Sequence, residues 1–506
     1  MNYLRQSLFG LIVVGILCSI GMVIMIRSHV DTINGGRVAV AERTAFETEA
    51  DSLVIQNVRV LSPDGSFFLN PRSVLIEDGT IVSINQGDSG PEGARLINAQ
   101  GRYLIPGLID GNVDLRRQPN DLLVYLANGV THVRDLSGQR EDLDLASELE
   151  SGRPGPTLSV ASPKLYSAGL IESAWMSMTR VAVNLRHPER AVETVGELAE
   201  AGYDAISIDA SLDPDVFQAI TTAAGEIGMR TIGRLPDRFD LTRLASTSLS
   251  ELARTEDLVE RLLDEFSGLN RGNDPSAFLD HLRDRSPQLA DALLSSGTAV
   301  NSTLWFTQTL ERQAGNLLDA LKDLPLAYAN PAMVEGSRYA GVGWLPGMNR
   351  YELPRDLDAE RRVETIAIWQ TRRQAQQLLI RELADRGVPI IAGSNATAEL
   401  MIPGFSLHDE LEMLNRIGLS PTEALRAATQ VPAAQMGLQS GVIEPGRDAS
   451  LVLLNSNPLV DISNTRTIAM VIRDGQVYDR DDLAAMLEAV RQAHARSRKF
   501  DLARYQ

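Results

Sequence analysis

The chain has 506 residues, 44% of them hydrophobic, and a formal net charge of −18 at pH 7. This length accommodates one large domain with a smaller one attached, and the acidic balance excludes nucleic acid as an expected partner, because that ligand needs a basic surface. The single cysteine, Cys18, allows neither a disulfide nor a thiol-based metal site within the chain.

The N-terminus contains an apolar run, residues 8–26, without a charged side chain. At 1.5 Å per residue, a helix of this length nearly spans a hydrocarbon core of about 30 Å. A small-x-small pattern, residues 39–41, lies too far downstream for a signal-peptide cleavage site. We therefore expect residues 1–27 to be an uncleaved single-pass transmembrane anchor, followed by a polar linker over 28–52.

The orientation of this anchor follows from the basic residues on its two sides. Arg5 and the terminal amine favour an N-terminus inside the cell, whereas Arg27, Arg37 and Arg43 compete on the other side. Our hypothesis is a bacterial-type inner membrane with the soluble domain in the periplasm, and the opposite orientation stays open.

Two β-rich blocks flank the middle of the chain. Residues 53–60 and 73–85 are rich in β-branched side chains and broken by turn signals, and a matching block runs from 441 to 478. One small β-domain built from both ends is expected, with its parts at 53–101 and 438–480. A helix over 481–498, within a C-terminal segment 481–506, carries apolar residues on one face.

The middle of the chain, residues 102–437, alternates short apolar runs with helical stretches. The predicted strands are 104–110, 130–134, 157–161, 205–208, 229–233, 247–250, 298–303 and 388–392. Eight strands with intervening helices predict an α/β protein with a (β/α)8 TIM barrel. Residues 252–296 are predicted to form a helical excursion between the sixth and seventh strands.

Several stretches resemble a known family. Residues 104–115, LIPGLIDGNVDL, resemble the first-strand signature of the amidohydrolase superfamily, in which PGLID is followed by x-His-x-His-Leu. The stretches 126–138, 403–411, 418–429 and 443–449 are similar to patterns of its imidazolonepropionase and Xaa-Pro dipeptidase-like branch. The resemblance implies hydrolysis of C–N bonds, with zinc or another divalent metal at the carboxyl ends of the barrel strands.

The positions that the resemblance assigns to metal ligands and to the general base carry other residues. Asn112 and Asp114 stand in place of the two histidines of the first strand, and Ser207 in place of the lysine of the fourth. Further substitutions lie on the fifth, sixth and eighth strands, where Arg234 and Glu251 replace histidines and Asn395 replaces the aspartate base. The remaining donors form an oxygen-only set that suits magnesium or calcium better than zinc. We therefore expect no metal cofactor.

The charges left at these positions suggest a substitute for the metal. Arg234 would bring a positive charge among the carboxylates, and a guanidinium about 4 Å from a divalent ion costs roughly 8 kcal/mol at an effective dielectric near 20. Our hypothesis is that Arg234 replaces the metal charge and pairs with Glu251 or Asp114. Lys164 is expected near the mouth of the third strand.

No residue is a clear catalyst, and the only candidates are Asn395 and Lys164. Asn395 could position a water but titrates poorly as a base. Lys164 could act as a Schiff-base nucleophile if burial depressed its pKa, although a lysine that simply lines the mouth is the commoner case. Ser207 has no predicted histidine nearby, and His408 is interpreted as structural.

Two functions remain open from the sequence. The first is a membrane-tethered pseudoenzyme that binds a small molecule or peptide at the barrel mouth, or pairs with a partner such as an active amidohydrolase paralogue. The mouth would be lined by Asn112, Asp114, Lys164, Ser207, Arg234, Glu251 and Asn395. The second is an active hydrolase of Xaa-Pro dipeptides or cyclic amides that uses a relocated or metal-free site.

Overall fold

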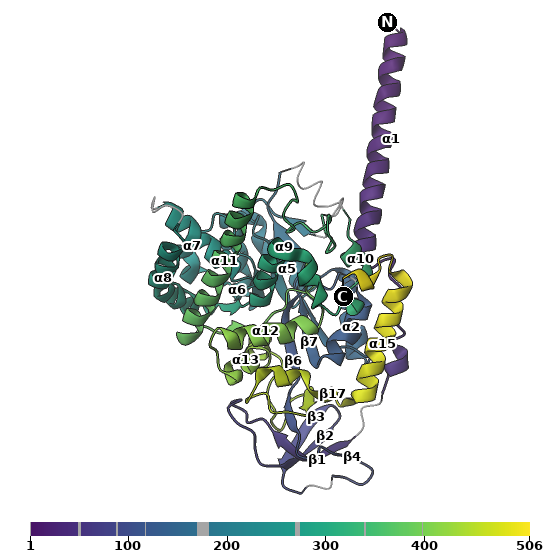
Figure 1. The fold of residues 1–506 in the computed structure, drawn as a ribbon, viewed down its shortest axis with the longest axis vertical. Helices are drawn as coiled ribbons and strands as arrows, with labels where there is room; N and C mark the ends of the chain where they lie inside the picture. The colour runs from purple at the N-terminus through teal and green to yellow at the C-terminus, as the bar shows by residue number, and fades with distance from the viewer. Residues whose placement is uncertain are drawn as a thin grey trace.

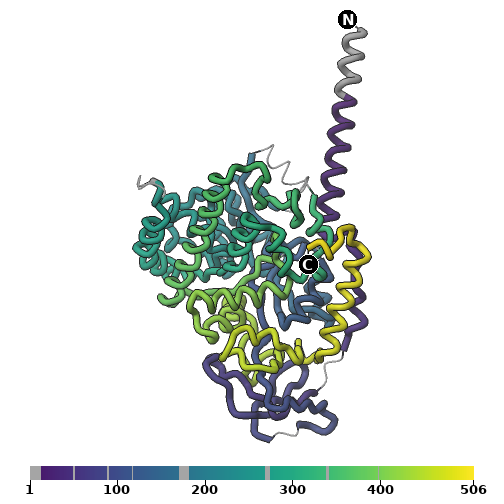
Figure 2. The backbone as a smooth tube through the Cα atoms, in the orientation of Figure 1, coloured from purple at the N-terminus to yellow at the C-terminus, as the bar shows by residue number. Residues whose placement is uncertain are grey.

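The structure is a computed structural model that describes residues 2–48, 52–87, 90–116, 118–169, 182–268, 274–337, 341–396 and 398–505, with side chains from residue 13 onward. Figures 1 and 2 show an elongated molecule in which a long N-terminal helix projects from one end and a small sheet lies at the other. The middle of the chain lies between them.

Strands from both ends of the chain form one sheet of eight strands, which we call the composite sheet. Its order is β18-β17-β16-β5-β1-β2-β3, with β4 paired to β1, and the antiparallel pairing of β5 with β16 links the two ends. The shared sheet expected from the sequence is therefore present. The strands are β1 Leu53–Val60, β2 Arg72–Glu77, β3 Thr80–Asn85, β4 Arg95–Asn98, β5 Tyr103–Pro106, β16 Leu451–Leu454, β17 Ile468–Arg473 and β18 Gln476–Asp479.

Tight turns close two hairpins of this sheet. Asp78 and Gly79 between β2 and β3 have φ of 48° and 72°, and Asp474 and Gly475 between β17 and β18 have φ of 50° and 81°. Asp-Gly pairs adopt two consecutive positive φ angles at low cost, and this turn matches the twist of the flanking strands. The local sequence thus specifies both hairpins.

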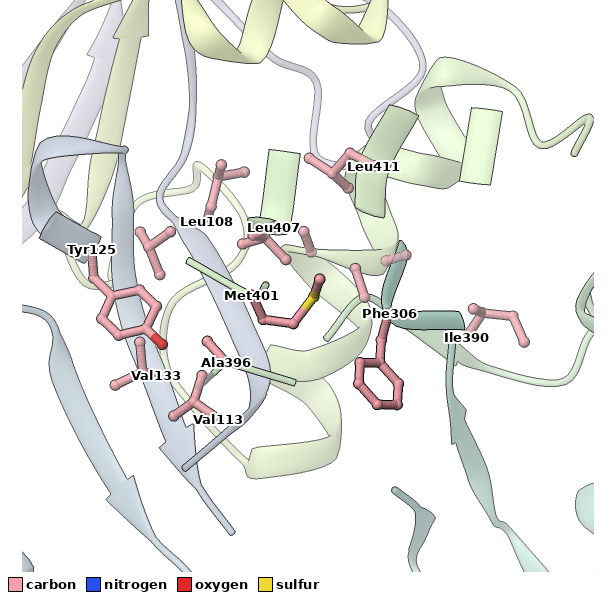
Figure 3. Packing of buried hydrophobic residues seen from close by; sticks show 14 of the residues in the cluster. Leu108, Val113, Tyr125, Val133, Phe306, Ile390, Ala396, Met401, Leu407 and Leu411 are labelled. Carbon is pink, nitrogen blue, oxygen red and sulfur yellow. The ribbon is translucent and has the colours of Figure 1, made fainter. Parts of the chain in front are cut away.

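Eight parallel strands in the middle of the chain pair in chain order. Two isolated parallel bridges, Ala161 with Ala205 and Val113 with Ala396, connect the two sheets that these strands form. Because the pairing returns from the last strand to the first, we call this set the strand ring. Its members are β6 Leu108–Val113, β7 Val130–Asp135, β8 Thr157–Val160, β11 Ala205–Ile208, β12 Arg230–Gly233, β13 Glu251–Leu252, β14 Ala299–Asn301 and β15 Ile390–Ile391. Figure 3 shows Val113 and Ala396 side by side with Val133 in the apolar core.

Two predicted strands are wrong in detail. The run 104–110 is two strands, because the chain leaves the composite sheet at Pro106 and enters the ring at Leu108. Gly107 permits this passage, since a Cβ there would meet the Thr131 hydroxyl oxygen at 2.0 Å. The other six predicted strands that overlap the ring differ from it by no more than a few residues at their ends, as is usual for strand boundaries.

The sixth strand is displaced from its predicted position, 247–250, to Glu251–Leu252. The start of the predicted strand is irregular because the hydroxyl group of Thr247 bonds to the local backbone. The Thr247 hydroxyl donates to the carbonyl of Leu244, and the amide of Leu249 lies 3.5 Å from the Thr247 oxygen. Such local bonds compete with strand pairing.

Helices surround the ring. The predicted excursion between the sixth and seventh strands is confirmed, because α7 and α8 fill it. The helices after β6 are α2 Pro119–Ala127, α3 Arg140–Glu150, α5 Ala191–Glu200, α6 Pro214–Glu226, α7 Glu256–Gly268, α8 Pro275–Ser296, α9 Leu304–Lys322, α10 Pro331–Glu335, α11 Ala359–Asp385, α12 Phe405–Arg416, α13 Pro421–Ala427 and α14 Gln430–Met436. Two strands that were not predicted, β9 Lys164–Tyr166 and β10 Ala182–Asn184, extend the sheet beyond β11.

The C-terminal helix, α15 Arg480–Ser497, confirms the predicted helix over 481–498. It buries Leu483, Met486 and Val490 and packs against α2. The carboxylate of Asp479 accepts hydrogen bonds from two amides of the first turn and caps the helix.

The N-terminal helix, α1 Asn2–Ile33, contains a segment, Val13–Ile33, with a mean hydropathy of 1.9, which is long and apolar enough to cross a membrane. A signal sequence near an N-terminus meets the same description. The helix continues into the predicted linker, and residues 34–48 then lie against the globular part. Residues 49–51 of that linker lie outside the described residues.

Candidate functional site at the carboxyl end of the strand ring

Five of the seven residues predicted to line the mouth lie near the carboxyl ends of ring strands or after them, whereas Lys164 begins β9 and Glu251 begins β13. Parallel strands in a ring present their carboxyl ends on one side, so these five residues share one end of the ring. Asn112 and Asp114 come from β6 and the loop after it, Lys164 from β9, Ser207 from β11, Arg234 from the segment after β12, Glu251 from β13, and Asn395 from the segment after β15.

A buried ion pair occupies the interior of the ring. Arg134 of β7 donates through Nε and Nη2 to the carbonyl oxygen of Gly111, at 3.0 and 2.8 Å, and through Nη2 to Oε1 of Glu251. Asn301 of β14 donates to the same carboxylate oxygen at 3.1 Å. The side chains of Arg134 and Glu251 are only 2% and 1% exposed, so the pair is removed from water, and its hydrogen bonds join four strands, β6, β7, β13 and β14.

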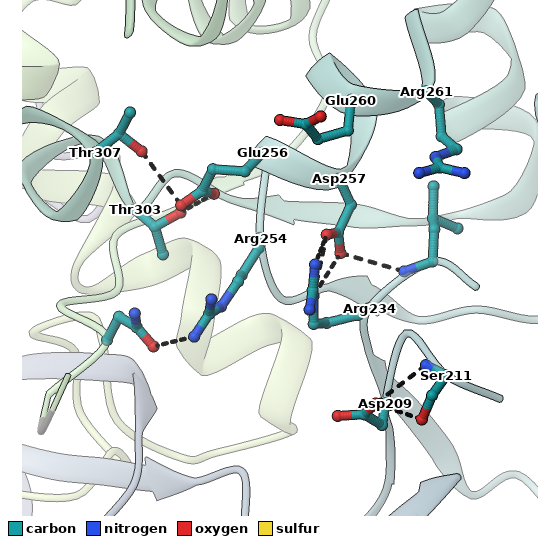
Figure 4. Close-up of polar contacts among 12 residues, drawn as sticks. Asp209, Ser211, Arg234, Arg254, Glu256, Asp257, Glu260, Arg261, Thr303 and Thr307 are labelled. Carbon is teal, nitrogen blue, oxygen red and sulfur yellow. Dashed lines mark hydrogen bonds and ion pairs between the residues drawn. The ribbon is translucent and has the colours of Figure 1, made fainter. Parts of the chain in front are cut away.

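The hypothesis for Arg234 is wrong as to its partner. Arg234 pairs with Asp257, with Nη2 2.6 Å and Nε 3.0 Å from Oδ1 (Figure 4). The reason is that α7 begins directly after β13 and places Asp257 beside the end of β12. Burial raises the pKa of Asp257, and the Arg234 guanidinium opposes that rise. The cation that neutralises Glu251 is Arg134, which the sequence did not single out.

The side chains of Asn112 and Asp114 both have partners, and that of Asn112 links two strands of the ring. The Asn112 amide donates to the carbonyl oxygen of Ala253 at 2.8 Å, which ties the first strand to the sixth. Asp114 pairs with the Nε of Arg116 at 3.0 Å. Neither side chain is presented to the centre of the ring as a free donor for a cation.

Both the backbone conformation and a side-chain hydrogen bond explain why an asparagine occupies position 395. Its φ is 55°, in the left-handed region that asparagine and aspartate tolerate better than other non-glycine residues. Its amide oxygen accepts a hydrogen bond from Arg254 at 3.1 Å. Asn395 therefore fixes the position of a guanidinium at the mouth.

Lys164 and Arg254 are two cations without a carboxylate partner in an ion pair among the described residues. Burial lowers the pKa of the Lys164 ammonium; Asp114 and Asp209 raise it, and Arg254 lowers it. The Arg254 guanidinium lies over the ring of Phe306, 5.3 Å from its centroid. Neither cation forms an ion pair with a carboxylate of the described part of the chain, although Asp114 and Asp209 lie near enough to Lys164 to raise its pKa.

Ser207 has a structural environment. It is buried, and its hydroxyl donates to the carbonyl oxygen of Leu136 at 2.7 Å. His408 bonds through its two ring nitrogens to Thr465 and to the carbonyl of Asn128, at 2.9 Å each, which agrees with the structural interpretation. Burial lowers the pKa of His408 to about 3.

Three residues of this region, Glu251, Asn301 and Asn395, have a buried polar atom without a partner among the described residues. In the described part of the chain, Oε2 of Glu251, Oδ1 of Asn301 and Nδ2 of Asn395 accept or donate no hydrogen bond. Such atoms are rare in proteins, and bound water or a ligand commonly accounts for them. Thr303, directly after β14, has φ of 44°, a strained conformation for a β-branched residue of the kind that clusters at functional sites.

Sequence reasoning missed Arg134, Arg254, Asp257, Asn301 and Thr303. The available signal was position, because Asn301 to Thr303 form a polar run directly after an apolar strand, and Arg254 and Asp257 follow the next strand in space. Asp110, within the PGLID motif, was also overlooked. Burial raises its pKa to about 6, against hydrogen bonds from the hydroxyl and the amide of Ser394.

The residues at this end do not fit the divalent metal that the resemblance implies. No group of three or more His, Cys, Asp or Glu side chains that could hold a metal ion occurs among the residues that the structure describes. The chemistry of the donors agrees, because Glu251 already accepts from Arg134 and Asn301, and Asp114 is paired with Arg116. A second positive charge beside Arg134 would be strongly repelled.

Comparisons with known proteins agree on one fold. Residues 354–478 match the model of the amidohydrolase family. A dihydroorotase of Citrifermentans bemidjiense is 42% identical over 65 residues, which cover 13% of this chain and only 15% of the relative. The bottromycin amidohydrolase structure is 20% identical with a TM-score of 0.64, covering 89% of this chain and 92% of that one. A Xaa-Pro dipeptidase structure with bound methionine in the active site is 15% identical with a TM-score of 0.60, covering 85% and 100%.

Proposed function

Because this chain belongs to the amidohydrolase superfamily, we propose that it is a membrane-anchored pseudoenzyme of that superfamily, with the strand ring as its (β/α)8 barrel. It binds a small ligand at the carboxyl end of the barrel and does not use a catalytic metal. The soluble domain lies on the periplasmic side of a bacterial-type inner membrane. An intact amidohydrolase paralogue is the partner that would supply hydrolysis.

The observation that carries this proposal is the Arg134–Glu251 ion pair. A guanidinium with a fixed +1 charge now sits against the carboxylate at the position that the resemblance assigns to a metal ligand. Releasing Glu251 to a metal would leave Arg134 buried and unpaired, which costs several kcal/mol. The site is therefore built to stay closed to divalent cations.

The charges and unpaired atoms indicate the class of ligand. Lys164 and Arg254 would receive an anionic group, and the unpaired oxygens of Glu251 and Asn301 would accept N–H or O–H donors. A small zwitterion such as a dipeptide or an amino acid presents both kinds of group. The Xaa-Pro dipeptidase with bound methionine, whose fold is similar, makes dipeptides and amino acids the first ligands to test.

The test is metal analysis of the purified full-length chain in detergent, together with an assay on Xaa-Pro dipeptides and cyclic amides. We expect less than about 0.1 metal ion per chain and no turnover. In thermal unfolding measurements, dipeptides should raise the unfolding temperature of the wild type but not that of Lys164→Met or Arg254→Met. Stoichiometric zinc, manganese or iron with turnover would end the pseudoenzyme proposal.

A second candidate is amide hydrolysis without a metal, and the environment of Lys164 favours it. Burial lowers the pKa of this amine, and a larger neutral fraction can act as a base or nucleophile. If this candidate holds, metal-free protein hydrolyses a Xaa-Pro dipeptide or a cyclic amide, and Lys164→Met abolishes that turnover. A matched Lys322→Met variant, on the exposed surface of α9, should retain it.

A further inference from the structure

The lower end of α1 is docked on the carboxyl end of the strand ring. Gln118, in the loop that follows β6, donates to the carbonyl oxygen of Ile33, the last residue of α1, at 3.2 Å. His29 lies 3.3 Å, Nδ1 to Oγ, from Ser337, which follows α10. Ile26 and Ile33 are buried in this contact, at 1% and 3% exposure. The helix thus meets the loop that carries Asp114 and Arg116.

The segment after α1 fixes this arrangement. A Cβ on Gly35 would lie 2.6 Å from the Gln118 amide nitrogen, so the backbone packs directly on that side chain. Asn120 then accepts from the amide of Ala41 at 2.8 Å and donates to the carbonyl of Ala39 at 3.0 Å. These contacts therefore fix the orientation of the globular part relative to α1.

The opposite end of the ring faces away from α1. Each ring strand begins at that end, and β6 enters it directly from the composite sheet at Gly107. Figure 1 shows α1 and the strands β1 to β4 at opposite ends of the long axis. The carboxyl end of the ring and the apolar helix consequently point the same way.

We propose that the docked helix α1 holds the carboxyl end of the ring against the lipid surface. The inference rests on the proposed membrane anchoring. A hydrocarbon core of about 30 Å takes up about 20 helical residues, so its boundary lies between Arg27, which ends the uncharged run 8–26, and Ile33, which ends the apolar segment Val13–Ile33. His29 and Ile33, which contact Ser337 and Gln118 of the globular part, then lie within about 10 Å of the hydrocarbon boundary.

One helix supplies a matched pair of probe sites. The helix α6 runs from the carboxyl end of β11 to the amino end of β12, about 18 Å by its length. Asp215 in its first turn and Ile227 directly after its end are both exposed, at 76% and 57%. In a Cys18→Ser background, which removes the only cysteine, Asp215→Cys and Ile227→Cys accept a fluorophore at the two ends.

The experiment reconstitutes each labelled full-length chain in phosphatidylcholine vesicles and measures quenching by a lipid with a spin-labelled headgroup. We expect quenching at position 215 at least about threefold stronger than at 227, whereas soluble iodide quenches both alike. Equal quenching, or stronger quenching at 227, in vesicle-bound protein would overturn the orientation alone. Failure of the chain to float with the vesicles would overturn the anchoring, and this inference with it.

Discussion

At the scale of single residues, the stability of the site depends on which cation forms an ion pair with Glu251. The pair with Arg134 is buried, and its charges are balanced by the Gly111 carbonyl and the Asn301 amide as well as by each other. The Arg234–Asp257 pair, by contrast, leaves the guanidinium 39% exposed. The interior pair therefore has the larger influence on stability, and the outer pair is partly screened by solvent.

We expect Glu251→Gln to lower the free energy of unfolding by about 3–5 kcal/mol, because it leaves the Arg134 charge buried without its partner. Denaturant unfolding of the full-length chain in detergent measures this loss. Replacing both residues, Arg134→Met with Glu251→Leu, should recover much of it, since no uncompensated charge remains. A loss no larger than that of Glu488→Gln, on the exposed face of α15, would contradict the argument.

At the scale of elements, the start of α9 depends on a carboxylate from another helix. Glu410 of α12 accepts hydrogen bonds from the amides of Leu304 and Trp305, at 2.9 and 2.7 Å, and from the hydroxyl of Ser302. These amides belong to a first helical turn, which has no acceptors of its own. Burial raises the pKa of Glu410 to about 7, although the hydrogen bonds oppose the rise.

This raised pKa gives a pH dependence with a definite sign. The folded protein binds a proton at Glu410 more tightly than the unfolded chain does. The contribution of this proton to the free energy of unfolding is therefore complete below about pH 4.5 and is lost as the pH rises through about 7. The stability advantage of the wild type over Glu410→Gln should therefore shrink between pH 4.5 and 7.5. Unfolding curves at the two pH values measure it, and an advantage that grows with pH would refute the assignment.

At the scale of the whole molecule, the N-terminal segment works as part of the globular structure. Its amides bond to Asn120 of α2 and, through Ala39, to the Ser497 hydroxyl of α15 at 2.7 Å. Charge supports the same contact, because Arg43 pairs with Glu148 of α3 at 3.2 Å. The segment thus contacts α2, α3 and the C-terminal helix α15.

We expect Asn120→Ala to release this segment without unfolding the domain. Amide hydrogen exchange in residues 38–46 should accelerate at least about tenfold, because the Ala41 amide loses its acceptor while the core contacts remain. Asn455→Ala, which removes an exposed bond to Thr467, is the control and should leave the segment unchanged. Unchanged exchange in Asn120→Ala would mean that other contacts hold the segment.

Individual strands and turns show which parts of the fold could be predicted from local sequence. The Asp-Gly turns and the apolar runs predicted the positions of most strands, because neighbouring residues determine the backbone conformation of a turn and the burial pattern of a strand. Strand six was misplaced, since the Thr247 hydroxyl bonds to the nearby backbone and the strand begins only at Glu251. The break at Gly107 was missed because only the packed Thr131 makes it necessary.

The sequence by itself determined the fold family and the apolar N-terminal helix, since both depend on residue identity in order along the chain. Only the tertiary structure decided that Arg134 rather than Arg234 faces Glu251, and that α1 is docked beside the carboxyl end of the ring. The physical reason is that charge pairing and docking depend on distances between segments far apart in the chain. Arg134 and Glu251 are separated by 117 positions, and no local pattern records which partner a buried charge will meet.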